Sequence, residues 1–344
     1  MCLLSLQLKI MKWKLILTCF AITLFACKAK KEIPDVSAIK ISLQAERFEK
    51  DFFALDTLHL DASLQKLHQQ HPGFTQDFLF NILGTTADSA SKDVPLFLRT
   101  YGTMYKAAAQ KFTNFNQVEA QVKRGLQFVH YYFPGYPVPS KLITFIGPIN
   151  SYGNIITPNA LAVGLQLYMG RDYPLYLTEE GQQLYPLFVS RRFEPEYIPV
   201  NCIRNIIDDM YPDKSIGRPL IEQMVEAGKR LYLMDKFLPG LPDTLKIGYT
   251  QQQLTGCYES EKNIWSFFVQ NDLLYNSDPN LTRDYMNDGP NTAALGDASP
   301  GNIGQFVGWQ IVNKWMEKRK NLSLPNLMQT PAKQIFDEAK YKPK

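Results

Sequence analysis

The strongest pattern of apolar and polar positions lies in residues 198–239. Apolar residues recur there at helical spacing in two runs, which predicts two helices joined by a short loop. Pro199 suits a first-turn position of the first helix. The buried faces of the two helices are predicted to contain Val200, Ile203, Ile207 and Met210, and then Ile221, Met224, Val225, Gly228, Leu231 and Tyr232. We expect this pair to form the middle of the core.

Polar residues on the same two helices are candidates for a functional site. Asn201, Asn205 and Asp208 follow one another at i, i+4 and i+7, so they form a polar stripe beside the apolar one. On the second helix, the polar edge is formed by Glu222, Glu226 and Lys229.

Helical patterns dominate the rest of the chain, with a β-rich centre. The alternation over residues 39–43 predicts an edge strand. Helical patterns follow over 46–56, 61–70, 94–109 and 116–132, and strand patterns over 141–146, 155–157 and 161–165. There is no internal repeat and no low-complexity linker. The pattern therefore predicts a single globular domain over residues 39–344, an α+β fold that is mainly helical around a small central sheet.

The C-terminal part contains three helix signals and one predicted loop. Thr250 and Gln253 form a capping-box sequence, predicted to open a helix that continues through Phe268. Residues 276–298 are rich in Gly, Pro, Asn and Asp, which predicts a long loop. A helix is predicted from 299, with Gly301, Gly304 and Gly308 letting another helix approach closely, and a last short one over 330–341.

The N-terminus has the layout of an export signal. Lys12 and Lys14 precede an apolar run over residues 15–26, which is too short to span a bilayer. The ending Leu24-Phe25-Ala26-Cys27 resembles the bacterial lipoprotein box, although Phe25 is bulkier than the usual residue. We predict a signal peptide over residues 1–26 with Met11 as the true start, lipidation of Cys27, and a lipidated tether over 27–38. A cleaved signal followed by an incidental cysteine is the alternative.

Lipidation would make this a membrane-anchored protein, because no other stretch is long and apolar enough to cross a bilayer. Lys28 is not the acidic residue associated with inner-membrane retention in some bacteria, which favours the outer membrane, facing the periplasm. Loss of Lys9, Lys12 and Lys14 with the signal reduces the formal charge from +4 to +1. A near-neutral domain has no electrostatic footprint for nucleic acid, so we exclude that class of partner.

Cysteines and histidines offer little chemistry. Cys202 and Cys257 are the only two of five cysteines in the body of the chain, and they are expected either as separate buried thiols or as one disulfide. His68 and His71 are spaced for two metal ligands on a helix, but no carboxylate or cysteine with matching spacing accompanies them. A helix-end pair is the favoured interpretation. No P-loop, dinucleotide fingerprint or nucleophile elbow is present.

The helix pair at 198–239 is similar in layout to zincin-like metallopeptidases. In that family, a helix carries H-E-x-x-H and a later helix supplies a third, glutamate ligand. The resemblance places Asn201, Cys202 and Asn205 at the metal-motif positions and Glu226 on the later helix. Neutral amides are poor zinc ligands, so the resemblance implies a degenerate, zincin-like pseudoenzyme. We predict no metal and no cofactor.

Longer stretches resemble a second family. They include LYMGRDYPLY (167–176), LIEQMVEAGKRLYLMDKFLP (220–239), SPGNIGQFVGWQIVNKWM (299–316) and three further blocks at 246–254, 261–278 and 335–344. Together with the signal, these resemble the gliding motility lipoprotein family GldB of Bacteroidetes bacteria. Residues 284–298 depart from the family, which usually has a more aromatic segment there. The resemblance implies a cell-envelope lipoprotein without enzymatic activity that works with other gliding and envelope proteins.

These observations lead to three hypotheses about the function. The first is a non-catalytic envelope lipoprotein of the gliding motility machinery, acting through protein–protein interaction. The second is an envelope hydrolase acting on peptide or peptidoglycan through an unrecognised carboxylate site, with Glu222, Glu226 and Glu261 as candidates. The third is a lipid- or glycan-binding module that uses the loop at 271–298.

Overall fold

The computed structural model describes residues 33–343. One compact unit begins at Val36 and runs to the C-terminus. Val36 is fully buried in the core. The chain from Val36 onward is therefore described as one unit. The predicted signal segment, the start at Met11 and Cys27 lie outside the described residues.

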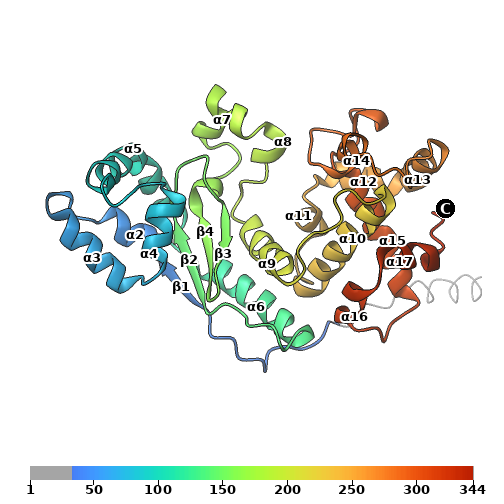
Figure 1. The fold of residues 1–344 in the computed structure, drawn as a ribbon, viewed down its shortest axis with the longest axis horizontal. Coiled ribbons are helices and arrows are strands. Elements are labelled where there is room, and N and C mark those ends of the chain that lie inside the picture. The colour runs from blue at the N-terminus through green and yellow to red at the C-terminus, as the bar shows by residue number, and fades with distance from the viewer. Residues whose placement is uncertain (1–32, 344) are drawn as a thin grey trace, which may run out of the picture. The chain divides into compact units, whose positions relative to one another are not determined.

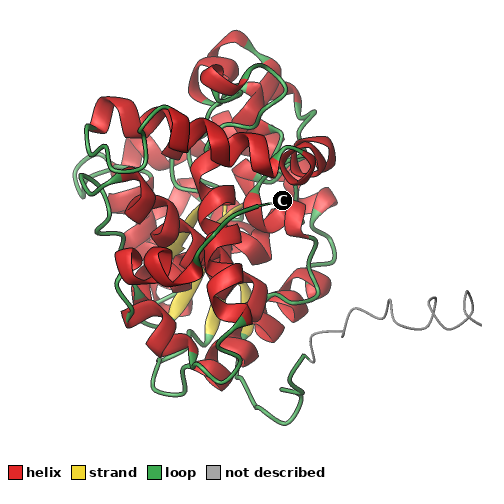
Figure 2. Cartoon of the chain, turned by 90° about the vertical axis from the view of Figure 1, so that its right-hand side faces the viewer, coloured by secondary structure: helices red, strands yellow, loops and turns green. Residues whose placement is uncertain are grey.

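A small sheet of four strands lies within the helices, in the order β1-β2-β4-β3. The strands are β1 (Gln44–Arg47), β2 (Lys141–Phe145), β3 (Asn154–Ile156) and β4 (Ala160–Gly164). β1, β2 and β4 are parallel, whereas β3 pairs antiparallel with β4 and forms an edge. The central strands β2 and β4 are buried almost throughout, because helices cover both faces of the sheet. Figure 2 shows the strands lying behind helices.

Helices are arranged around this sheet in two groups. Figure 1 shows the first group on one side of the sheet, and α6 and α9 on the other side. The first group is α2 (Phe48–Phe53), α3 (Leu60–Gln70), α4 (Phe74–Gln76) and α5 (Ala90–Lys111). α6 (Asn116–Tyr132) packs closely on α9 (Tyr197–Met210), because Gly125 leaves room for the side chain of Ile203. Pro199 occupies the first turn of α9, as predicted.

A further group of helices includes the pair α10 (Leu220–Phe237) and α15 (Ile303–Glu317), whose faces are mostly buried. This pair is flanked by α14 (Pro279–Met286), α16 (Leu324–Gln329) and α17 (Ala332–Ala339). A Cβ atom at Gly308 would lie 1.6 Å from the main-chain oxygen of Met224, which confirms that this glycine permits a close helix approach. The other helices are α7 (Glu179–Leu184), α8 (Leu187–Ser190), α11 (Asp243–Ile247), α12 (Gln251–Glu259) and α13 (Glu261–Gln270).

The structure corrects the predicted edge strand. Ile41 and Leu43 are buried, as the alternation indicates, but residues 39–43 form no ladder. Strand pairing begins only where the Gln44 amide donates to the Ser140 carbonyl, because the partner strand β2 begins at Lys141. The chain before Gln44 therefore has no strand beside it. The predicted helix over 46–56 is correspondingly shorter and runs from 48 to 53.

Three C-terminal predictions are also corrected. The capping box at Thr250 is present, but the helix it opens ends at Glu259, and α13 begins after Ser260. The predicted loop over 276–298 contains α14, which begins with the Asp278 cap and Pro279. The helix predicted from residue 299 begins at Ile303, because Asn302 adopts a left-handed conformation just before it.

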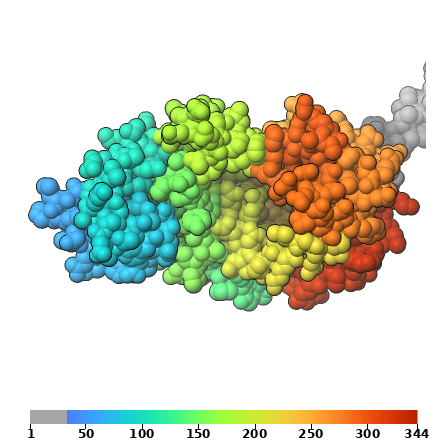
Figure 3. Space-filling model, turned by 45° about the horizontal axis from the view of Figure 1, so that its top comes forward, coloured from blue at the N-terminus to red at the C-terminus, as the bar shows by residue number. Residues whose placement is uncertain are grey.

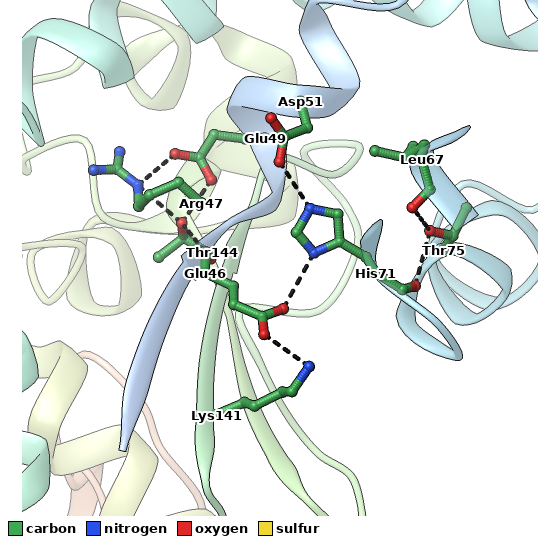
Figure 4. A network of polar contacts seen from close by, with 9 residues as sticks. All are labelled: Glu46, Arg47, Glu49, Asp51, Leu67, His71, Thr75, Lys141 and Thr144. Carbon is green, nitrogen blue, oxygen red and sulfur yellow. Dashed lines mark hydrogen bonds and ion pairs between the residues drawn. The ribbon is translucent and has the colours of Figure 1, made fainter. Parts of the chain in front are cut away.

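A polar network fastens the first helices to the sheet (Figure 4). His71, at the C-terminal end of α3, has both ring nitrogens facing carboxylates. Nε2 lies 2.8 Å from Asp51, and Nδ1 lies 3.1 Å from Glu46. Lys141 at the start of β2 also contacts Glu46, at 2.7 Å. Because the ring is buried and fully engaged, while His68 is exposed, the two histidines do not form a ligand pair.

Glu49 lies next to this network and is almost completely buried. Its carboxylate accepts hydrogen bonds from Arg47 at 2.7 Å and from the Thr144 hydroxyl at 2.6 Å. Burial raises the pKa of Glu49, and the Arg47 charge and the Thr144 hydroxyl oppose that increase. Through these bonds to Arg47 and Thr144, Glu49 links β1 and α2 to the central strand β2 (Figure 4).

Candidate functional site

Helix α9 separates two cavities. The first has a volume of about 440 Å³, and we call it the arginine pocket. Figure 3 shows the surface hollowed between the light-green segment that contains α8 and the orange segment that follows α14. The charged side chains that line the arginine pocket are Arg191, Arg192, Arg204, Arg230, Asp208 and Asp288, and Asn201 lies among them.

The amphipathic pattern of α9 directs its polar residues into this pocket. Val200, Ile203 and Ile207 are buried. Asn201 and Arg204 lie one turn apart on α9, along the edge of this buried face, and both line the cavity. Arg230 comes from α10. Residues from separate elements therefore converge on one cavity.

Each acidic side chain of the arginine pocket is already paired. Asp208 lies 2.5 Å from Arg230, and Asp288 pairs with Arg192. Arg230 also donates to the main-chain oxygen of Tyr211. Burial raises the pKa of Asp208, and the charges of Arg230 and Arg204 oppose that increase.

Arg191 and Arg204 bond to main-chain oxygens instead. Arg191 donates to Gly248 at 2.7 Å, and Arg204 donates to Lys246 at 3.2 Å. In residues 33–343 neither guanidinium has a carboxylate within ion-pair distance, although Asp288 and Asp208 act on them from further away. Burial lowers the pKa of both arginines, and the positive charge of Arg192 lowers it further. The pocket therefore has an excess of positive charge.

Asn201 belongs to a chain of hydrogen bonds that joins α9 to the sheet. Its amide donates to the Tyr168 hydroxyl at 2.8 Å, and that hydroxyl donates to the side-chain oxygen of Asn154 on β3. The Asn154 amide in turn lies 3.7 Å from the sulfur of Cys202. Burial raises the pKa of Tyr168, and it raises the pKa of Cys202 to about 12. These groups stay neutral and hold the helix in place.

Asn205 faces the second cavity, on the other side of α9. This cavity of about 680 Å³ lies along the edge strand β3 and also contacts Asp208 and Asp209. Asp208 lines both cavities, so the predicted polar stripe of α9 is indeed the surface that faces them. Asp209 accepts a hydrogen bond from the Tyr136 hydroxyl at 2.7 Å.

Glu226 is not brought together with Asn201 and Asn205 in either cavity. Its carboxylate lies 2.8 Å from the ammonium group of Lys229. Lys229 is almost fully buried and also donates to the Thr330 carbonyl at 2.7 Å. The side chain of Glu226 is therefore engaged where α10 meets the segment between α16 and α17.

The other glutamates of the hydrolase hypothesis have separate partners. Glu222 lies 3.9 Å from Arg218, and Glu261 accepts a hydrogen bond from Tyr341. Neither lines the two cavities beside α9. Within residues 33–343, no three side chains of His, Cys, Asp or Glu are grouped so that they could hold a metal ion.

The fold and site define a mainly helical α+β protein with an arginine-lined pocket beside its sheet. The chain belongs to the gliding motility protein GldB family, which matches residues 29–343. No curated protein and no solved structure matches the chain. Family membership indicates a gliding motility protein that is lipid-anchored in the cell envelope. The comparisons do not support the more distant resemblance to zincin-like metallopeptidases.

Among the helices of the described residues, none combines the length and the apolar character that crossing a membrane requires. Cys202 and Cys257 are separate buried thiols, so the first of the two expectations for these cysteines is confirmed. The arginines of the pocket were missed by the sequence reasoning. The adjacent pair at 191 and 192, and Arg204 within the polar stripe, were the available signals.

Proposed function

We propose that this chain is a non-catalytic cell-envelope lipoprotein of the gliding motility machinery, acting by binding other gliding and envelope proteins. Its anchor is the lipid on Cys27, and the domain faces the periplasm from the outer membrane. Family membership supports the link to gliding. No cofactor takes part in this role.

The hydrogen-bonded chain around Asn201 is the observation that supports a non-catalytic role. The amide of Asn201 is committed to Tyr168, and the thiol of Cys202 stays protonated at neutral pH because burial raises its pKa to about 12. A protonated thiol is neither a metal ligand nor a nucleophile. In this proposal, Asn201 and Asn205 stand on α9 where a zincin-like scaffold would have its metal ligands, whereas Glu226 is paired with Lys229 away from them and completes no ligand set.

Metal content tests the non-catalytic role. The full-length protein, purified in detergent, is measured for zinc and then unfolded thermally with and without a chelator. We expect no stoichiometric zinc and the same melting temperature in both conditions, because neutral amides bind zinc poorly. Zinc near one per chain, lost together with stability on chelation, would contradict the proposal and favour the hydrolase.

Exposed leucines on the α7–α8 segment supply a surface for protein binding. Leu184 and Leu187 are 47% and 63% exposed, and Leu177 just before α7 is 51% exposed. Apolar side chains gathered on one segment indicate an interaction site more strongly than scattered ones do. Figure 1 shows α7 and α8 together at the top of the described unit.

Complementation tests this surface. A gliding strain that lacks the protein receives the parent chain, the double variant Leu184→Glu with Leu187→Glu, or the control Leu58→Glu. Leu58 is 88% exposed in a different part of the unit. We expect the double variant to reach normal abundance but to lose colony spreading, and the control to spread normally. Normal spreading by the double variant would rule out this surface.

A further inference from the structure

We propose that the arginine pocket binds an oxyanion, a ligand that presents a carboxylate or phosphate group to Arg191 and Arg204. This site goes beyond the proposed protein-binding role and does not depend on it. Figure 3 shows the hollow in which the pocket lies, open to the surface beside the α7–α8 segment.

The charge of the pocket is the first argument. Four guanidinium groups meet two carboxylates in its wall, and both carboxylates are paired, with Arg192 and with Arg230. Arg191 and Arg204 thus contribute two positive charges that no nearby carboxylate of the described chain neutralises by an ion pair. Arg204 is exposed and Arg191 is half-buried, so both charges face the open cavity, and a cleft lined by charges of one sign attracts a counter-charge. An anion in the cavity supplies that counter-charge.

Unused hydrogen-bond donors are the second argument. A guanidinium carries five N–H groups, and Arg204 has one hydrogen bond, to the Lys246 carbonyl. Arg191 has two carbonyl partners, Phe188 and Gly248. The Nε atom of Arg230 is buried and has no hydrogen-bond partner in the protein. Several donors on residues that line one cavity are therefore available to an acceptor-rich ligand.

The arginines are also held in place before any ligand arrives. Arg191 and Arg204 come from different elements, and each is fixed by a main-chain oxygen of the segment 246–248. Because their positions are set by the fold, a ligand does not have to order them. Structural arginines that merely bond carbonyls would not need to share one open cavity of about 440 Å³.

The residue type selects the ligand class. The planar fork of arginine matches the oxygen pairs of carboxylate and phosphate, and it binds them with two parallel hydrogen bonds. The cavity volume is at the small end of the range for ligand pockets, roughly 300–1,000 Å³. Ile207, Leu231 and Met234 add an apolar wall. The pocket therefore fits a small anion, or one acidic group of a larger molecule.

Titration calorimetry on the full-length protein in detergent tests the proposal. The probes are inorganic phosphate, pyrophosphate and succinate, each titrated at constant ionic strength with chloride as the background anion. We expect saturable binding of at least one probe, and the comparison of phosphates with succinate tells which oxyanion the pocket prefers. Arg204→Gln and Arg191→Gln are each expected to weaken that binding roughly tenfold or more.

Arg99→Gln is the matched control, because Arg99 is an exposed arginine on α5 outside the pocket. Its affinity is expected to equal that of the parent protein. The two pocket variants lie on different elements, so if circular dichroism shows that one does not fold, the other decides the question. No saturable binding of any probe, or equal affinity in the parent and a folded pocket variant, would overturn the assignment.

Discussion

Substitution of Gly308 by alanine is the sharpest test of the packing between α10 and α15. A Cβ atom at this position would lie 1.6 Å from the oxygen of Met224 and 2.3 Å from its carbonyl carbon. These are main-chain atoms inside a helix, so no side-chain rotation removes the clash. Real Cβ contacts stay above 3.0 Å, and the helices would have to separate by about 1.4 Å, the difference between 3.0 and 1.6 Å.

Two opposing terms set the expected magnitude. Alanine in place of glycine inside a helix stabilises by about 0.5–1 kcal/mol. Overpacking costs about 1–3 kcal/mol, and a gap of even 0.5–1 Å along the rest of the interface forfeits about a quarter to a half of each dispersion contact there. The interface is long and buried on both helices. The net of the two terms is a fall in the free energy of unfolding of up to about 2.5 kcal/mol, and the lost dispersion contacts move the expectation to the upper part of that range, about 1.5–2.5 kcal/mol.

Urea unfolding followed by circular dichroism measures this change. Gly256→Ala on α12 is the matched control, because a Cβ atom there meets nothing within 4 Å. It is expected to stabilise by about 0.5–1 kcal/mol. Gly228→Ala, which would contact the main chain of Gly308 at 2.2 Å, is expected to destabilise through the same separation, so the double variant should lose less than the sum. A Gly308→Ala protein as stable as the parent would refute the packing argument.

Two further predictions concern titratable groups. Burial alone would raise the pKa of Glu46, but hydrogen bonds from Lys141 and His71 outweigh it and lower the pKa below 4.5. Glu46→Gln should therefore be less stable than the parent at pH 7. The difference should shrink as the pH falls below 4.5, because the parent then loses the stability that the ionised Glu46 contributes. A difference that does not depend on pH would contradict this prediction. Burial raises the pKa of Cys202 and Cys257 to about 12, so alkylation at pH 8, mapped by mass spectrometry, should reach both thiols only in urea. Labelling of either thiol in the folded protein would show that it is accessible.

Local sequence signals predicted the helical part of this fold well. The helix predicted over 116–132 has those bounds as α6, and the capping box at Thr250 is present with both of its hydrogen bonds. Apolar periodicity reports which face is buried, and a cap reports where a helix begins, so both features can be read from neighbouring residues. The missed helix α14 had such a signal too, in Asp278-Pro279, but its polar composition was interpreted as a loop.

Features that depend on a distant partner could not be predicted in this way. The strand β1 begins at Gln44 only because β2 begins at Lys141, and nothing in residues 39–47 records that position. The arginine pocket also depends on contacts between residues that are far apart in the sequence. The pairing of Asp208 with Arg230 and the anchoring of Arg204 on the Lys246 carbonyl join separate helices and loops. Of the predicted site residues, Asn201 and Asn205 line cavities because they share the polar face of α9.

The charges around α9 also bear on what this site can hold. A zinc site needs electron-pair donors, and carboxylates or thiolates help to compensate the charge of the cation. Here Asn201 offers only a neutral amide oxygen, and the surrounding cavity has four guanidinium groups with two paired carboxylates. Guanidinium charges that no carboxylate neutralises oppose the binding of a divalent cation and favour that of an anion. The positive charge argues against a metal at Asn201, and it is also the basis of the oxyanion site at Arg191 and Arg204. The zinc measurement and the phosphate titration therefore both test this electrostatic argument.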